Sequence, residues 1–178
     1  MKEKISSRHI AVCAMIAAVY TVLCLATPLL SYGMIQVRVA EALTLLPVLS
    51  PVAIWGVTLG CAVSNFVGWI TGANPIGGID TVVGTSATLI AGIITYRLRD
   101  VRAWGLPIAS AMAPVVVNAI IIGGQLSIVF AGSLHPVIFL TNALWVAVGQ
   151  MIACVALGLP LLKAIERNNF LGSLFYST

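Results

Sequence analysis

The fold is decided by residues 104–130, which read WGLPIASAMAPVVVNAIIIGGQLSIVF and contain no acidic, basic or histidine side chain. A helix of this length exceeds the roughly 20 residues that cross the hydrocarbon core of a bilayer. The rest of the chain has the same character, because 60% of its 178 residues are hydrophobic and only 8% are charged. Soluble domains carry about 25% charged residues to cover their surface. The sequence therefore predicts an all-α integral membrane protein.

Six helices are expected, within a single domain that occupies residues 1–178. Pro51 divides the apolar stretch that precedes residue 70, because proline removes a helical hydrogen bond and disfavours helix in the residue before it. Residues 71–80, TGANPIGGID, have the glycine, asparagine and proline content of a loop. The predicted helices cover residues 9–30, 41–49, 51–70, 80–98, 104–130 and 136–165.

Eight of the nine lysine and arginine residues lie in three clusters. The clusters are Lys2, Lys4 and Arg8, then Arg97, Arg99 and Arg102, and finally Lys163 and Arg167. Basic side chains concentrate in cytoplasmic loops, so six crossings from a cytoplasmic N-terminus would place all three clusters, and the C-terminus, in the cytoplasm. The net charge of +4 is thus interpreted as a topology signal and not as a nucleic-acid site.

The sequence offers no motif for catalysis or for a metal. Its four cysteines lie inside apolar segments without C-x-x-C spacing, where thiols act as small hydrophobic groups. No HExxH, GxSxG or Walker A motif is found. We therefore expect no enzyme, no catalytic residue, no metal, no cofactor and no ATPase activity of the chain's own.

Two carboxylates, Glu41 and Asp80, are expected at membrane depth at the outer ends of helices. Ionisable groups are costly there and usually mark the path of a ligand or an ion. Two other interpretations remain open. Asp80 could stabilise the N-terminus of its helix, and Glu41 could form a surface pair with Arg38, three residues earlier.

Amides and tryptophans on several predicted helices add to these acids. Asn118 and Gln125 share one helix face, Asn142 and Trp145 share another, and Trp69 lies near the outer end of the helix 51–70. The amides could instead bond neighbouring helices, and Trp69 could anchor in the headgroup region. Together they predict a pocket for a flat polar ligand. Its expected binding residues are Arg38, Glu41, Trp69, Asp80, Asn118, Gln125, Asn142 and Trp145.

Ala14 and Ala18 form a small-xxx-small pair on the first predicted helix. Small residues allow another helix to approach closely in lipid. The pair is expected either to meet a partner subunit or to pack inside this bundle.

Two stretches resemble the QueT family, which consists of substrate-binding S-components of energy-coupling factor (ECF) vitamin transporters. They are residues 32–47, YGMIQVRVAEALTLLP, and residues 74–92, NPIGGIDTVVGTSATLIAG. The resemblance implies a subunit in the plasma membrane of a prokaryote that takes up a queuosine precursor or a related 7-deazaguanine. It also implies a membrane T-component, which would meet Ala14 and Ala18, and two cytoplasmic ATPase subunits.

The predicted pocket suits such a ligand, because a carboxylate can accept both the ring N–H and the exocyclic amine of a 7-deazaguanine. The tryptophans could stack on the ring. A different interpretation is a small ion-coupled secondary transporter or channel that acts as a homo-oligomer, with Glu41 as its proton carrier.

Overall fold

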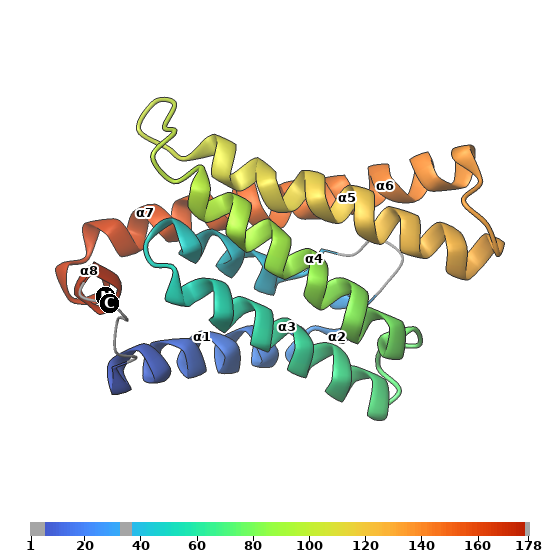
Figure 1. The fold of residues 1–178 in the computed structure, drawn as a ribbon, viewed down its shortest axis with the longest axis horizontal. Helices are drawn as coiled ribbons and strands as arrows, with labels where there is room; N and C mark the ends of the chain where they lie inside the picture. Colours follow the sequence, from blue (N-terminus) through green and yellow to red (C-terminus); the bar gives the residue numbers. More distant parts are fainter. Residues whose placement is uncertain (1–5, 33–36, 177–178) are drawn as a thin grey trace.

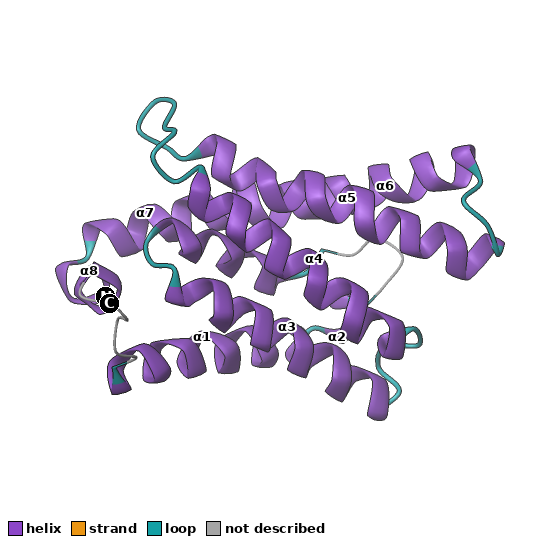
Figure 2. Ribbon diagram, viewed as in Figure 1, coloured by secondary structure: helices purple, strands orange, loops and turns teal. Residues whose placement is uncertain are grey.

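The computed structural model describes residues 6–32 and 37–176. Within this part the regular structure is entirely helical (Figure 2). The long helices are α1 (Ser7–Ala26), α3 (Val52–Ile70), α4 (Gly77–Arg97) and α5 (Ile108–Ala131), followed by α6 (Pro136–Gln150), η2 (Met151–Gly158) and α7 (Leu159–Arg167) in one continuous run. The short helices are α2 (Pro28–Ser31), η1 (Val39–Val48) and α8 (Asn169–Tyr176).

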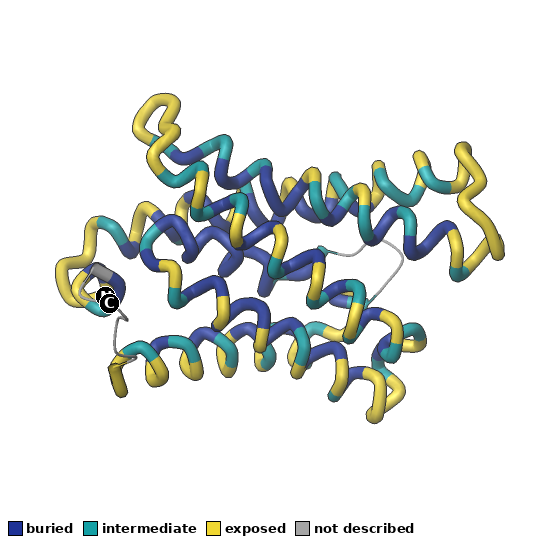
Figure 3. The backbone as a smooth tube through the Cα atoms, viewed as in Figure 1, coloured by how far each residue is buried: buried dark blue, intermediate teal, exposed yellow. Residues whose placement is uncertain are grey.

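Five of these helices are long and apolar enough to cross a membrane: α1, α3, α4, α5 and the run Pro136–Arg167. The shorter apolar helix η1 makes the sixth. These elements confirm the expected all-α membrane bundle of six helices. The faces turned toward the centre of the bundle are buried and the outward faces are exposed (Figure 3), as expected where lipid surrounds the helices.

Three segments differ from their predicted form, and proline accounts for two of these differences. The expected helix 9–30 is interrupted at Thr27, since Pro28 starts the separate helix α2. The expected helix 104–130 begins only at Ile108, after Pro107, and the preceding residues form a tight turn. Beyond the predicted end of the last helix at residue 165, the chain continues through α7 and forms the additional helix α8.

The short helix η1 has an unusual geometry and a central place. It is a 3₁₀ helix of ten residues, although such runs seldom exceed three or four residues. Residues 40–48 are all buried, and η1 packs most extensively against the π-helix η2. In Figure 1, η1 starts in the middle of the bundle and runs only to one end of it.

Two glycines allow the long helices to pack closely. A Cβ atom at Gly60 of α3 would lie 2.6 Å from Cβ of Tyr20 on α1, and one at Gly123 of α5 would lie 2.8 Å from Cα of Ala143 on α6. Close backbone approach through small residues is the usual means of helix association in lipid. These contacts tie α1 to α3 and α5 to α6.

The start of α1, the loop between α4 and α5, and helices α7 and α8 all lie at one end of the bundle (Figure 1). Arg102 of this loop pairs with Glu166 of α7, and Arg8 donates to the carbonyl oxygen of Ser173 in α8. All described members of the three basic clusters therefore lie at this end, called the basic end below. Lys2 and Lys4 lie outside the described residues.

Candidate substrate-binding site

Five buried polar side chains from five segments meet at the end of the bundle opposite the basic end. Arg38 precedes η1, Asn65 lies on α3, Asn74 in the following loop, Asp80 in the first turn of α4, and Gln125 on α5. We call them the Asp80 cluster. None of the five is more than 6% exposed.

The carboxylate of Asp80 organises this cluster. Its Oδ2 atom accepts from Arg38 Nη2 at 3.1 Å and from Asn74 Nδ2 at 2.9 Å, and its Oδ1 atom accepts from Gln125 Nε2 at 2.6 Å. Asn65 bridges the same groups, since its Oδ1 accepts from Arg38 at 3.0 Å and its Nδ2 donates to the Asp80 carbonyl oxygen at 3.1 Å. Every donor comes from another segment, so capping of α4 does not account for Asp80.

Arg38 also contacts residues at the end of α2, outside the Asp80 cluster. Its Nε donates to the carbonyl oxygen of Ser31 at 3.0 Å, and its guanidinium lies 5.3 Å from the ring centre of Tyr32. Its carboxylate partner is Asp80 at 3.1 Å. The surface pair between Arg38 and Glu41 considered from the sequence is therefore wrong, since Arg38 is committed to Asp80 and both residues are buried.

Glu41 occupies a separate position between α1 and η2. Its side chain is 2% exposed, and its Oε1 atom accepts from the hydroxyl of Tyr20 at 2.6 Å. The thiol of Cys154 on η2 lies 3.5 Å from the carbonyl oxygen of Glu41. The second carboxylate oxygen, Oε2, has no hydrogen-bond partner among the described residues.

Other buried polar atoms are also unpartnered within the described structure. They are Oε1 of Gln125, Nδ2 of Asn142 and Oγ1 of Thr85. Buried polar groups normally find a partner, and leaving one unsatisfied is costly. Gln125 and Asn142 each lie six residues from a helix end, which is about 9 Å at 1.5 Å per residue. The unpartnered atoms include both acceptors and a donor.

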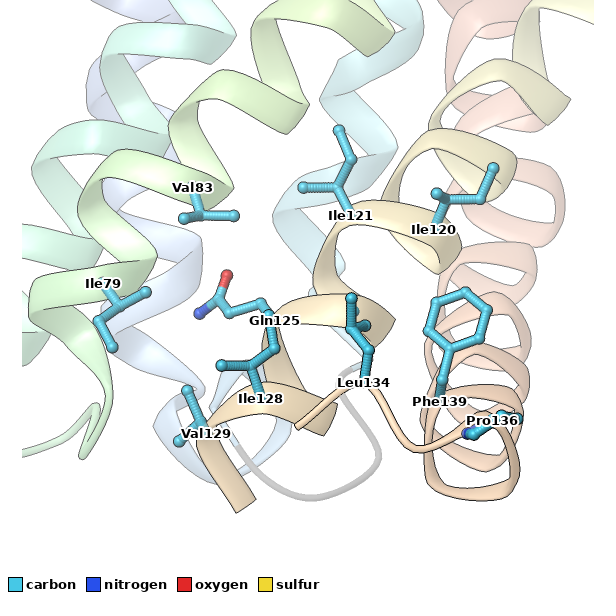
Figure 4. Close-up of a pocket in the computed structure, with 11 residues that line it drawn as sticks. Ile79, Val83, Ile120, Ile121, Gln125, Ile128, Val129, Leu134, Pro136 and Phe139 are labelled. Carbon is cyan, nitrogen blue, oxygen red and sulfur yellow. The ribbon is translucent and has the colours of Figure 1, made fainter. Parts of the chain in front are cut away.

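A cavity of about 710 Å³ opens between α4, α5 and the start of α6 (Figure 4). Ile79, Val83, Ile121 and Phe139 are among its apolar walls, and Gln125 is the polar side chain among the described lining residues. In Figure 4 the Gln125 amide extends toward Val83 and Ile79 on α4. The volume is typical of small-molecule sites. Gln125 thus joins an apolar pocket to the Asp80 cluster.

The structure does not bring the predicted tryptophans to this cluster. Trp69 is 52% exposed, covers Gly77 and Gly78, and meets the edge of Phe66, while Trp145 is 46% exposed. Both lie on the outward surface of the bundle, where tryptophan commonly anchors a protein at the membrane boundary. Asn118 is buried on α5 but takes no part in the hydrogen bonds of the Asp80 cluster.

Ala14 and Ala18 are both exposed on α1. The opposite face of α1, with Ile16 and Tyr20, packs against Gly56 and Gly60 of α3. The prediction that Ala14 and Ala18 pack inside this bundle is therefore wrong. Their face of α1 is open to lipid or to a partner subunit.

Asn65, Asn74 and Tyr20 are not among the binding residues expected from the sequence. Asn74 stood in a glycine-rich loop that indicated only a turn, and Tyr20 in an apolar run. Within the described residues, no group of three or more His, Cys, Asp or Glu side chains is placed to bind a metal ion.

Comparison with known proteins agrees with this membrane architecture. A family model described as QueT transporter matches residues 10–167. The queuosine precursor transporter QueT of Lactococcus lactis subsp. cremoris (strain MG1363) is 35% identical over 83 residues, which are 46% of this chain and 49% of that protein. The chain thus spans about half the length of this curated relative. No solved structure matches the chain.

Proposed function

This chain belongs to the QueT transporter family, and from that premise we propose that it is the substrate-binding membrane subunit, or S-component, of an ECF importer. Its substrate is a queuosine precursor or a related 7-deazaguanine. The protein is a multi-pass protein of the prokaryotic plasma membrane. The end that holds the Asp80 cluster faces the outside and collects the substrate, and the basic end faces the cytoplasm.

The observation that carries this proposal is the set of buried, unpartnered atoms: Glu41 Oε2, Gln125 Oε1 and Asn142 Nδ2. A 7-deazaguanine presents a ring N–H and an exocyclic amine as donors and a carbonyl oxygen as an acceptor. The two oxygens would accept from the ligand and the amide of Asn142 would donate to it. Bound substrate would then satisfy groups that the described chain leaves without a partner.

In this proposal the two carboxylates have different roles. The oxygens of Asp80 already accept three hydrogen bonds from Arg38, Asn74 and Gln125, so Asp80 positions these side chains around the substrate. Glu41 retains a free oxygen and reads the ligand's donors directly. The pocket beside Gln125, with Ile79, Val83 and Phe139, supplies the apolar walls that a flat ring requires.

The partners in this proposal are a membrane T-component and two ATPase subunits. The sequence has no Walker A loop, so energy would come from the other subunits. The exposed Ala14 and Ala18 give α1 a smooth face onto which a helix of the T-component can pack.

Substrate binding is tested by Glu41→Gln. The amide keeps its bond to Tyr20 through the oxygen, but it turns an N–H toward the N–H groups of the ligand. Loss of a charge-assisted hydrogen bond costs about 1.5–3 kcal/mol, which is roughly a 10- to 150-fold loss of affinity. Calorimetric titration of the purified protein with 7-aminomethyl-7-deazaguanine measures this change.

Tyr20→Phe is the matched control, because it removes the bond to Oε1 and leaves the unpartnered Oε2 intact. Its affinity should fall by less than that of Glu41→Gln. A folded Glu41→Gln protein with unchanged affinity would remove Glu41 from the site.

The partner assignment is tested separately by replacing Ala14 and Ala18 with leucine. Both side chains are exposed, so the protein should fold and bind substrate as before. Uptake in proteoliposomes with the T-component and ATPases should be lost, because leucine holds the helices apart. Equal loss of binding and uptake would contradict a partner face. Uptake by this chain alone would indicate an ion-coupled transporter instead.

A further inference from the structure

The loop between α4 and α5 contains a tight hairpin that neither the fold nor the proposed binding site explains. Ala103 and Leu106 exchange both backbone hydrogen bonds, at 2.9 and 3.0 Å. The turn between them consists of Trp104 and Gly105, with φ angles of 52° and 77°. Turns with two positive φ angles favour Asn-Gly, and a bulky side chain in this region is an outlier. Trp104 is therefore held in a strained conformation.

The side chain of Trp104 is also 93% exposed. Arg102, two residues before Trp104, contacts both carboxylate oxygens of Glu166 on α7, at 3.3 and 2.5 Å. This ion pair links the base of the hairpin to α7, and the hairpin presents a large aromatic ring that its own bundle does not cover. Strained residues cluster where a protein makes functional contacts. In addition, removing the apolar surface of an exposed indole from water lowers the free energy.

The position of the hairpin indicates what covers the ring. Helix α4 ends at Arg97 and α5 begins at Ile108, and each is long enough to cross the bilayer. The hairpin between them therefore lies at the membrane boundary. In Figure 1 it extends sideways past α5, while α7 and α8 reach farther along the long axis. A hairpin that extends sideways at the level of the helix ends would meet lipid headgroups before it met bulk water.

We propose that residues 103–106 form an interfacial anchor that inserts the Trp104 indole among the lipid headgroups of the leaflet at the basic end. Tryptophan is the residue most suited to this layer, where one side of the ring meets acyl chains and its N–H meets polar groups. Arg97 is exposed at the end of α4, whereas Arg99 lies 3.7 Å from the carboxylate of Asp100. The charge of Arg97 selects anionic headgroups over zwitterionic ones.

The depth of Trp104 tests this anchor through quenching of its fluorescence. A protein that retains only this tryptophan carries Trp55→Phe, Trp69→Phe and Trp145→Phe. Reconstituted into nanodiscs whose lipids carry bromine close to the headgroup, it should lose most of its emission, while aqueous iodide should have little effect. Brominated phosphatidylglycerol should quench more than brominated phosphatidylcholine at equal content, and Arg97→Gln should reduce this difference.

A second protein that retains only Trp55 serves as the matched control. Trp55 is 60% exposed in the first turn of α3, near the same end, and calibrates a lipid-facing helical position. If the triple variants do not fold, the difference between the natural protein and Trp104→Phe in brominated nanodiscs gives the same quantity. Quenching of Trp104 by iodide alone would place the ring in water, and protection from both quenchers would show a protein cover. Either result overturns the anchor, and equal quenching by the two lipids overturns its charge preference.

Discussion

Arg38 and Asp80 are 42 positions apart in the chain and form a buried ion pair at 3.1 Å. Such pairs add little net stability, because the loss of hydration offsets the attraction. Removing one partner is different, since the remaining charge is then buried alone. The pair therefore fixes where the segment before η1 meets α4, and it makes the cluster sensitive to single substitutions.

Asp80→Asn should destabilise the protein by about 3–5 kcal/mol, because it leaves the Arg38 guanidinium buried without a counter-charge. The double variant Arg38→Gln, Asp80→Asn removes both charges and should recover part of this loss. Thermal unfolding in detergent, followed by circular dichroism for the two single variants and the double variant, measures the coupling. Additive losses in the double variant would mean that the pair is not the source of the effect.

The sequence identifies the buried charged residues of the site, but it does not show which residues they pair with. Arg38, Glu41 and Asp80 stand out in the sequence because charges are rare in apolar segments. The pairing of Arg38 with Asp80 and of Glu41 with Tyr20 depends on how segments far apart in the sequence meet, which no local pattern encodes. Helical periodicity shows that Asn142 and Trp145 share a face, but it cannot tell which faces meet lipid.

Among the elements, the apolar runs predicted the six helices but not their geometry. The 3₁₀ form of η1 and the π form of η2 differ from an α-helix by small shifts in hydrogen bonding, and both segments have ordinary apolar sequences. Mutual packing selects these forms, since Gly158 of η2 lies against Ala42 and Leu45 of η1. Proline accounts for the break at Pro28 and the start of α5 after Pro107, two boundaries that the predicted helices 9–30 and 104–130 did not include.

Two adjacent glycines on α5 provide a matched test of helix packing. A Cβ atom at Gly123 would lie 2.8 Å from the backbone of Ala143, whereas one at Gly124 would have its nearest contact at 3.8 Å. Gly123→Ala should therefore separate α5 from α6 and cost about 1–3 kcal/mol through overpacking. Gly124→Ala should be neutral or stabilising by up to about 1 kcal/mol, because alanine favours helix.

Thermal unfolding of both variants in the same detergent gives the comparison. Equal stability of the two proteins would show that α5 and α6 are not in close contact at Gly123.

For the whole molecule, the charge pattern predicted an arrangement that the structure shares. The described members of three clusters far apart in sequence lie at one end of the bundle (Figure 1). Hydropathy and charge distribution are sufficient for this result, because each crossing reverses the side of the membrane. The direction of insertion follows from the positive-inside rule and is a prediction.

Cysteine labelling in intact cells tests this direction. After removal of the native cysteines, Ser133→Cys and Ala73→Cys should react with a membrane-impermeant maleimide from outside, since both lie in loops opposite the basic end. Ala103→Cys should react only after the membrane is permeabilised. Labelling of position 103 in intact cells would reverse the orientation, and with it the side from which substrate enters.

The brevity of η1 has a consequence for the electric field across the membrane. Ten residues of 3₁₀ helix extend about 20 Å at 2.0 Å per residue, whereas the hydrocarbon core is about 30 Å thick. At the end that holds the Asp80 cluster, the part of the bundle that η1 does not reach contains buried polar side chains of α3, α4 and α5. If water enters this part with the substrate, the potential falls mainly across the remaining two thirds. A cationic substrate bound there would cross roughly one third of the field, worth about 0.8 of the 2.3 kcal/mol per 100 mV. Its capture would thus depend little on the membrane potential, and most of the electrical work would fall on the later step of release.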